Sequence, residues 1–133
     1  MMFSVILPTY NRAKFIEGAI NSVLNQDYLN WELIIIDDFS TDNTQTLVEK
    51  FNDKRIRYVK YKNNGIIAKA RNYGIKLSNG NYLAFLDSDD WWYPNKLTTM
   101  ADLIKEHPYD CLYHNMHMKY NNSYFKKKMM MKY

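Results

Sequence analysis

The stretch YLAFLDSDD, residues 82–90, decides the fold of this 133-residue chain. Its apolar first half, residues 82–86, predicts an inner strand of a parallel sheet that is buried on both faces. Three carboxylates follow at once, Asp87, Asp89 and Asp90, and burying them is costly unless a cation meets them. If the strand bends into a loop, Asp87 and Asp89 converge, and such oxygen ligands suit Mg²⁺ or Mn²⁺ with a diphosphate supplying further oxygens. The same residues also suit an ordinary turn and helix N-cap.

Short apolar runs alternate with helical patterns along the rest of the chain, which is typical of a parallel sheet with crossover helices. Strands are expected at residues 3–7, 31–36, 56–61, 82–86 and 110–116. Among the helices between them, the first is expected to be capped by Asn11 and to carry Phe15 inward, and the third to bury Ile67. The expected fold class is α/β: a Rossmann-like, mostly parallel sheet flanked by helices in three α/β/α layers.

Composition narrows the class of protein. The length suits one domain, and much of the basic excess behind the net charge of +4 lies late, in Lys126–Lys128. Without a folded surface of interleaved aromatics, that run does not predict nucleic-acid binding; a weak contact with an anionic membrane surface is more plausible. Cys111 stands alone, so we expect a buried thiol on a strand and no disulfide. No membrane span or signal peptide is recognised, and the expected location is cytoplasmic, with a membrane-peripheral one as the alternative.

Polar side chains follow three of the expected strands, whose carboxyl ends meet at the edge where open α/β sheets bind ligands. There Tyr10 is expected to stack on an aromatic base, Asp38 to accept a hydrogen bond from a base or ribose, and Asp89 to hold a metal diphosphate. With no Walker lysine loop or Gly-rich dinucleotide turn, Arg71 is the candidate phosphate ligand. The ordinary alternatives are a packed loop aromatic for Tyr10 and a surface ion pair for Arg71. Asp37 is expected to point away and bond the local backbone.

Four segments in this order and spacing resemble the family 2 glycosyltransferases of the GT-A fold. They are SVILPTYNR (4–12), ELIIIDDFSTD (32–42), ARNYGI (70–75) and GNYLAFLDSDD (80–90). The resemblance covers about residues 3 to 116. It implies a nucleotide-diphosphate-sugar donor, most often UDP-linked, an inverting transfer, and Mn²⁺ or Mg²⁺ as cofactor.

The resemblance also assigns roles to residues of the first two strand ends. Pro8, Thr9 and Tyr10 match the loop that packs on the base, and Asn11 continues that loop as a nucleotide-binding candidate. Asp38 matches the carboxylate that reads uracil.

The remaining roles belong to the third helix and the acidic motif. Arg71 matches a basic residue near the nucleotide. Asp89 is the implied principal metal ligand, with Asp87 as a second, and Asp87 or Ser88 lies near the ribose and diphosphate. The implied role of the metal is to neutralise the leaving diphosphate.

The family's catalytic base and acceptor-binding region lie well beyond the acidic motif, and Glu106 and Asp110 are too close to that motif to match them. No catalytic residue is therefore named, and the acceptor, whether glycan, lipid or protein, is unknown. Two alternatives to an active transferase stay open: a nucleotide-sugar-binding module without catalysis, and a donor half that needs another chain. An aspartate-dependent phosphohydrolase fits less well, because its aspartates belong after the first strand; a receiver-like domain leaves the acidic motif unexplained.

The chain is accordingly divided into two parts. Residues 1–118 are expected to form the nucleotide-sugar-binding domain, and residues 119–133 a basic Lys/Met-rich tail that is disordered or frayed, with a short terminal helix as the alternative. The tail is the candidate for a weak contact with a membrane surface or a partner chain.

Overall fold

The computed structural model describes residues 1–107, 110–112, 116–120 and 123–127. This part of the chain contains ten helices and strands. In chain order they are β1 (Phe3–Thr9), α1 (Ile16–Leu24), β2 (Trp31–Asp37), α2 (Thr44–Glu49), β3 (Ile56–Lys60), α3 (Ile67–Leu77), β4 (Tyr82–Phe85), α4 (Lys96–Glu106), β5 (Met116–Tyr120) and β6 (Ser123–Lys127). None of the described helices has the length and apolar composition needed to cross a membrane.

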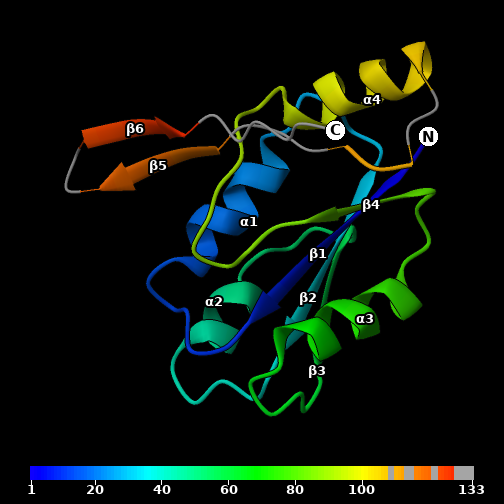
Figure 1. Cartoon of the computed structure of the whole chain (residues 1–133). Coiled ribbons are helices and arrows are strands. Elements are labelled where there is room, and N and C mark those ends of the chain that lie inside the picture. Colours follow the sequence, from blue (N-terminus) through cyan, green and yellow to red (C-terminus); the bar gives the residue numbers. More distant parts are fainter. Residues whose placement is uncertain (108–109, 113–115, 121–122, 128–133) are drawn as a thin grey trace.

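The first four strands form one parallel sheet in the order β3-β2-β1-β4 (Figure 1). β1 and β2 lie in the middle, and all seven residues of each are buried. Their near-continuous apolar runs explain the position, because a strand of a parallel sheet is covered on both faces and needs no polar alternation.

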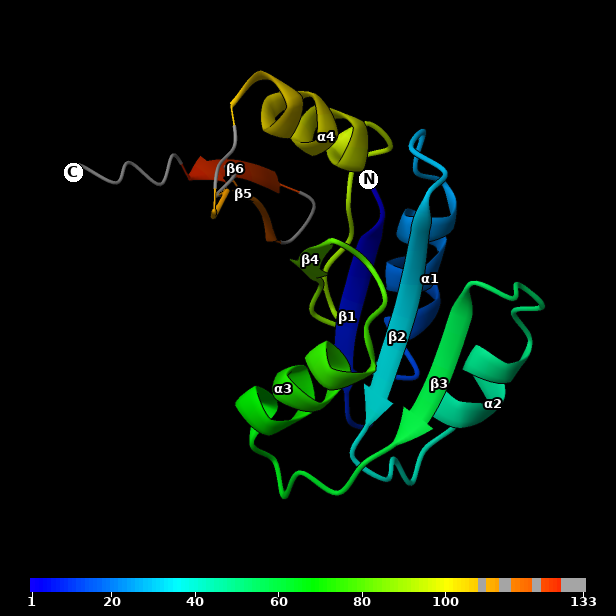
Figure 2. The same ribbon diagram turned by 90° about the vertical axis from the view of Figure 1, so that its right-hand side faces the viewer.

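Helices cover both faces of the sheet, as the three-layer prediction requires (Figure 2). On one face, α1, α2 and α4 pack in a large core cluster against alternate residues of the central strands, such as Val5 and Leu33. On the other face, α3 packs through Ala70 against Ile34 and Ile36. Successive residues of a strand point to opposite faces, so the same two strands supply both cores.

The predicted central position of the acidic strand is wrong for the described part of the chain. There β4 pairs with β1 alone, and the side chains of Leu83 and Phe85 are 41% and 45% exposed. An apolar run identifies a strand, but its neighbours are chosen by contacts distant in sequence, so the run alone does not separate an inner strand from an edge strand.

The first and third helices differ from prediction at their starts. Asn11 does not cap α1; it adopts a left-handed backbone conformation, and the helix begins later, at Ile16. Phe15 and Ile67, both expected inward, are 52% and 55% exposed. Further along α1 the apolar residues Ile16, Ala19, Ile20 and Val23 are buried. The side chain of Asn11 instead accepts from the backbone of Thr41, and a turn closed on the carbonyl of Arg12 precedes α1.

The C-terminal part also departs from the expected pattern. Residues 110–112 are not in a strand, and Cys111 is exposed rather than buried. β5 and β6 pair antiparallel as a separate two-stranded sheet, so Ser123–Lys127 is a strand where a frayed tail is expected. Of the rest of the predicted tail, Lys119 and Tyr120 end β5, whereas residues 121–122 and 128–133 lie outside the described residues. The division at residue 118 stays a prediction.

A buried polar network joins the amino ends of the central strands to the turn before β4. The hydroxyl of Ser4 donates to Glu32 Oε1 (2.6 Å) and accepts from the backbone N–H of Gly80 (2.8 Å). Asn79 donates to the same carboxylate through its backbone N–H (2.6 Å) and its side-chain amide (3.1 Å). Burial alone raises the pKa of Glu32, but these hydrogen bonds and the charge of Arg57 outweigh it and hold the pKa below its usual value.

We predict that Glu32→Gln destabilises the fold at neutral pH and much less in acid. Because the folded-state pKa is depressed, the ionised carboxylate contributes stability above its unfolded-state pKa, and this contribution is lost as the pH falls through the folded-state pKa. The loss at pH 7 should be about 1–3 kcal/mol, as expected when buried hydrogen bonds to a charged group are weakened. Urea unfolding of both proteins at pH 7 and pH 3 measures it, with the exposed Glu106→Gln as control. A deficit independent of pH would contradict the ionic role of Glu32.

Candidate functional site

The carboxyl ends of the four parallel strands meet at one edge of the sheet, and the loops that follow β1, β2 and β3 gather there (Figure 2). Pro8 and Thr9 close β1 and are buried, whereas Tyr10, the next residue, is 52% exposed. Opposite Thr9 in the register lies Asp37, the last residue of β2. The sequence prediction that Tyr10 and Asp38 come from adjacent strand ends is therefore confirmed.

Asn11 holds two of these loops together. Its side-chain oxygen accepts from the backbone N–H of Thr41 (2.8 Å), and its own backbone N–H donates to the hydroxyl of Ser40 (2.9 Å). The next two residues add two more bonds between the same loops: the backbone N–H groups of Arg12 and Ala13 donate to the side chains of Thr44 and Asp42, both at 3.0 Å. Asn11 is thus placed to support the site through the loops, and its predicted contact with the nucleotide stays a prediction.

Asp37 is a structural carboxylate, as expected. It is fully buried and accepts from the backbone N–H and the hydroxyl of Ser40, and from the hydroxyl of Tyr58 (2.5 Å). Burial first, and then the hydrogen bond and charge of Asp37, raise the pKa of Tyr58 well above its ordinary value, so the tyrosine stays a neutral donor. Asp37 therefore fixes the turn that presents Asp38.

Asp38 faces the other way, toward the loops at the carboxyl ends of the strands. Its two carboxylate oxygens accept from the backbone N–H groups of Asn63 and Gly65, both at 2.8 Å. Partial burial raises the pKa of this carboxyl. The hydrogen bonds from these N–H groups and from that of Asn64, together with the charge of Lys62, lower it by more, so the pKa lies below its ordinary value. Asp38 is consequently an anion at neutral pH, able to accept additional hydrogen bonds on its remaining lone pairs.

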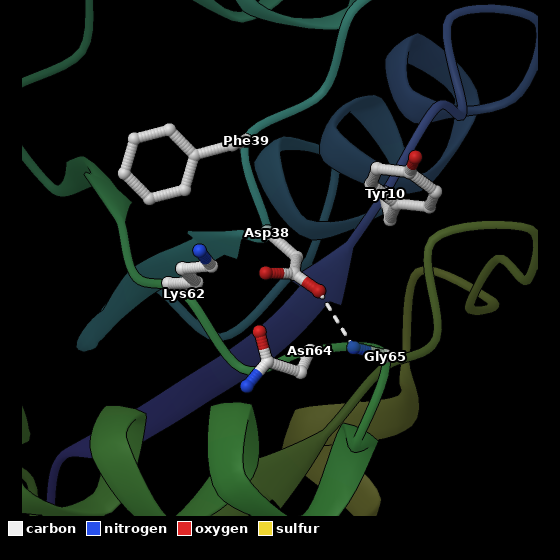
Figure 3. A pocket seen from close by; sticks show the side chains of 6 residues that line it. All are labelled: Tyr10, Asp38, Phe39, Lys62, Asn64 and Gly65. Atoms are coloured by element: carbon white, nitrogen blue, oxygen red, sulfur yellow. Dashed lines mark hydrogen bonds between the residues drawn. The ribbon is translucent and has the colours of Figure 1, made fainter.

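A pocket of ≈ 580 Å³ opens around Asp38 (Figure 3). Its walls come from the loops after β1, β2 and β3: Tyr10, Asp38, Phe39, Lys62, Asn64 and Gly65. The volume lies within the ordinary range of small-molecule sites, about 300–1,000 Å³. Aromatic rings beside a single carboxylate suit a flat, partly apolar ligand that carries a hydrogen-bond donor.

Phe39 lines this pocket in an unusual backbone conformation. Its φ of 57° lies in the left-handed region, and the side chain is 52% exposed. Such a conformation in a bulky residue costs on the order of 1–3 kcal/mol and persists only where the surroundings enforce it. The enforcing contact is the turn closed by Asp37 on Ser40.

The acidic motif is paired with arginines. Arg71 Nη2 lies 2.6 Å from Asp87 Oδ1, and Arg12 Nε lies 3.8 Å from Asp89 Oδ2. Ser88, between the two aspartates, is buried at 6% exposure. Arg71 forms an ion pair, as the ordinary alternative expects, and its partner belongs to the acidic motif. Its predicted contact with phosphate stays a prediction.

The donor set fits a metal that is completed by its substrate. Within the described residues, no three Asp, Glu, His or Cys side chains form a cluster able to hold a metal ion. Asp87 and Asp89 offer oxygens suited to Mg²⁺ or Mn²⁺, yet each faces a guanidinium. Moreover, Arg71 Nε is buried without a hydrogen-bond partner among the described residues, which suits an anion placed nearby.

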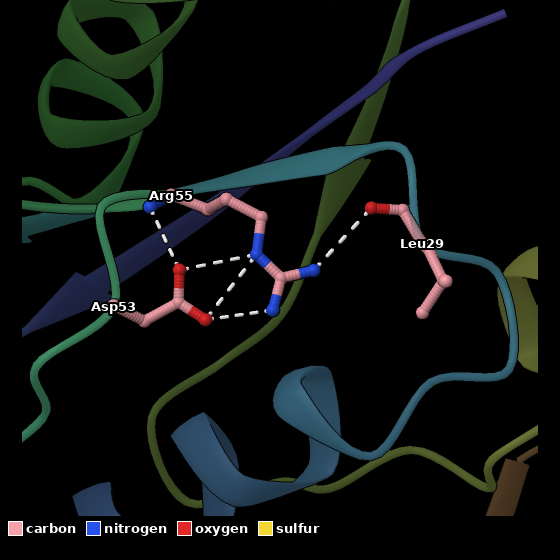
Figure 4. Close-up of polar contacts among 3 residues, drawn as sticks. All are labelled: Leu29, Asp53 and Arg55. Atoms are coloured by element: carbon pink, nitrogen blue, oxygen red, sulfur yellow. Dashed lines mark hydrogen bonds and ion pairs between the residues drawn. The ribbon is translucent and has the colours of Figure 1, made fainter.

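A second charged cluster lies before β3 and is structural (Figure 4). Arg55 forms an ion pair with Asp53 (2.6 Å), donates to the backbone carbonyl of Leu29 (3.3 Å), and lies 3.8 Å from the ring centre of Trp31. The guanidinium thus covers the start of β2. Its contacts are all accounted for by the fold.

Five residues of the site region were missed by sequence reasoning: Arg12, Phe39, Lys62, Asn64 and Gly65. Arg12 and Phe39 stand inside quoted motifs, but nothing in a single sequence shows which side chains of a loop face a pocket. The sequence indicates only a turn at residues 63–65 and does not single out Lys62. One signal in the sequence could have indicated the turn at residues 63–65: an anionic Asp38 needs hydrogen-bond donors, and a turn with left-handed residues can supply backbone N–H groups.

The comparisons with known proteins agree with this geometry. The family model described as Glycosyl transferase family 2 matches residues 4–132. This chain belongs to glycosyl transferase family 2. It is 40% identical over 122 residues to the UDP-Glc:alpha-D-GlcNAc-diphosphoundecaprenol beta-1,3-glucosyltransferase WfgD of Escherichia coli, covering 92% of this chain and 48% of that relative. It is 34% identical over 129 residues to the glycosyltransferase GlyG of Streptococcus pneumoniae, covering 93% and 43%.

Solved structures confirm the predicted GT-A fold. The crystal structure of Staphylococcus aureus TarS 1-349 in complex with UDP superposes with a TM-score of 0.77 at 38% identity, over 81% of this chain and 33% of that chain. The mannosyltransferase PcManGT from Pyrobaculum calidifontis, in complex with GDP-Man and Mn²⁺, superposes with a TM-score of 0.66 at 30% identity, over 77% and 31%. The chain thus spans about half the length of WfgD and less than half of each of the other three proteins.

We predict that the two neighbouring aspartates respond differently to truncation. Asp37→Ala should destabilise the fold by about 2–3 kcal/mol, because it removes a fully buried acceptor and leaves the part-buried donors of Ser40 and Tyr58 unpaired. Asp38→Ala should cost about 1 kcal/mol or less, because Asp38 lies at an open pocket, where water can replace the carboxylate as the acceptor for the N–H of Gly65. Thermal unfolding of the two variants beside the parent measures this. Equal losses would contradict the division into a structural and a ligand-facing carboxylate.

Proposed function

We propose that this chain binds a nucleotide-diphosphate sugar, with UDP as the nucleotide, and serves a metal-dependent, inverting glycosyl transfer. The observation that carries the proposal is the pocket at the carboxyl edge, where Tyr10 and the anionic Asp38 lie together. TarS has been solved with UDP and with UDP-GlcNAc, and PcManGT with GDP-Man and Mn²⁺, which supports the donor class and the use of a metal.

In this proposal the base is held by the first two strand ends. The half-exposed ring of Tyr10 stacks on the base, and the Asp38 carboxylate accepts the N–H of uracil on a lone pair not used by Asn63 and Gly65. Adenine and guanine present different donors in different positions, so the carboxylate discriminates among nucleotides as well as adding affinity.

The diphosphate is held beyond β4. Arg71 contacts Asp87 through Nη2, and a guanidinium carries five N–H donors, so the same side chain has donors left for phosphate. Mn²⁺ or Mg²⁺, bound with Asp89 and Asp87, would supply the positive charge that neutralises the leaving diphosphate. The arginines that contact Asp87 and Asp89 hold these carboxylates in place before donor and metal arrive together.

A second function, donor binding without transfer, is favoured by one observation. An inverting transfer needs a carboxylate that takes the acceptor proton, and Asp38, Asp87 and Asp89 are each already engaged by backbone N–H groups or by arginine. UDP release from UDP-sugars, measured with and without sugar and lipid-linked acceptors, separates the two functions. The name of WfgD, with its diphosphoundecaprenol-linked substrate, supports including lipid-linked acceptors.

We predict that UDP stabilises the chain and that Asp38 selects it. At about a hundred times its dissociation constant, UDP should add about 2.7 kcal/mol of stability, which raises Tm by several degrees. ADP and GDP should shift Tm less, and Asp38→Ala should lose most of the UDP shift. Asp102→Ala, an exposed aspartate on α4, is the matched control and should keep the shift. Equal shifts from all three nucleotides, or a full shift in Asp38→Ala, would sink the assignment.

We also predict that metal and nucleotide bind together. Mn²⁺ alone should bind weakly, because the described site offers few protein ligands, and more tightly once UDP supplies phosphate oxygens. Calorimetric titration of Mn²⁺ with and without UDP measures this coupling, and Asp89→Asn should abolish most of it while Asp102→Asn should not. The proposal of metal dependence fails if the UDP affinity is the same in EDTA and in Mn²⁺.

A further inference from the structure

We propose that Phe39 is the second aromatic wall of the base pocket and contributes to nucleotide affinity. The proposal rests on the function proposed above and names a residue that the sequence motifs do not single out. Tyr10 and Phe39 lie on opposite sides of Asp38, with the pocket between them (Figure 3). A base that meets the carboxylate of Asp38 is therefore flanked by both rings, and flat aromatic ligands gain from such contact.

The backbone at Phe39 requires a left-handed conformation but does not require a phenylalanine. The turn that Asp37 closes on Ser40 places residue 39 at a φ of 57°. Glycine adopts that conformation without strain, and asparagine or aspartate with little, whereas a bulky side chain is disfavoured. The sequence thus carries an unsuitable residue type at this position, and the compensation has to come from the ring.

The fold alone does not supply that compensation. The Phe39 side chain is 52% exposed and belongs to neither core cluster. Lys60 Nζ lies 5.9 Å from the ring centre, close to the limit at which a cation–π contact is significant. Exposure by itself is no argument, because Phe15 is equally exposed, but Phe15 has a negative φ of −122° and does not line the pocket. Phe39 combines strain, exposure and a place on the pocket wall.

The test is Phe39→Gly, which removes the ring and relieves the backbone at once. Without nucleotide, its Tm should equal or exceed that of the parent, because glycine suits the left-handed position. Its UDP dissociation constant, measured by calorimetry in Mn²⁺, should rise about tenfold, the loss typical of one base–aromatic contact. Phe39→Tyr should keep the affinity within about twofold, since the ring is retained. Phe15→Ala is the control and should leave UDP binding unchanged.

The outcomes separate this inference from the function on which it rests. If Phe39→Gly binds UDP as tightly as the parent while Asp38→Ala does not, the UDP site stands and the role of Phe39 is overturned. If Phe39→Gly lowers the Tm of the nucleotide-free protein, the ring is a packing element of the fold, and the role is overturned as well. If the parent itself binds no UDP, the proposed function fails, whatever the variants do.

Discussion

The parallel pairing of β1 with β2 is the constraint on which the rest of the structure depends. Seven residue pairs, from Phe3 with Trp31 to Thr9 with Asp37, bury both strands completely. Such burial on both faces is possible only because crossover helices cover the sheet, and it fixes the register, since a slip of one residue turns every side chain to the wrong face. The register sets Tyr10 beside Asp38, and the pocket follows from that position.

The two edges of the sheet use buried carboxylates for opposite purposes. At the amino edge, Glu32 is enclosed by Ser4 and Asn79 and serves only the fold. At the carboxyl edge, Asp37 closes a turn within the protein while Asp38 faces a pocket. The difference lies in the exposure of the carboxylates themselves: Glu32 and Asp37 are buried, whereas Asp38 is only partly buried and lines a pocket, where a ligand has access.

Much of the fold was predictable from the sequence, because apolar runs and helical spacing report burial directly. The strands around Val5 and Leu33 and the inward face of α1 follow from that pattern alone. The edge position of β4, the exposure of Phe15 and the late start of α1 were not predictable, because neighbour choice and loop length depend on distant contacts. Within the site, the motifs located Tyr10, Asp38 and the acidic motif, but the orientation of Phe39, Lys62 and Arg12 depends on how three loops interlock.

The most direct test of the central claim, that the carboxyl edge of the sheet is a nucleotide and metal site, is backbone-amide NMR of this chain titrated with UDP and then with Mn²⁺. The account predicts that UDP shifts the amide signals of Tyr10, Phe39 and Gly65, and that Mn²⁺ added afterwards broadens those of Ser88 and Asp89. The amides of Asn79 and Gly80, at the amino edge, should stay unchanged. Shifts centred on the amino edge, or Mn²⁺ broadening away from the acidic motif, would contradict the account.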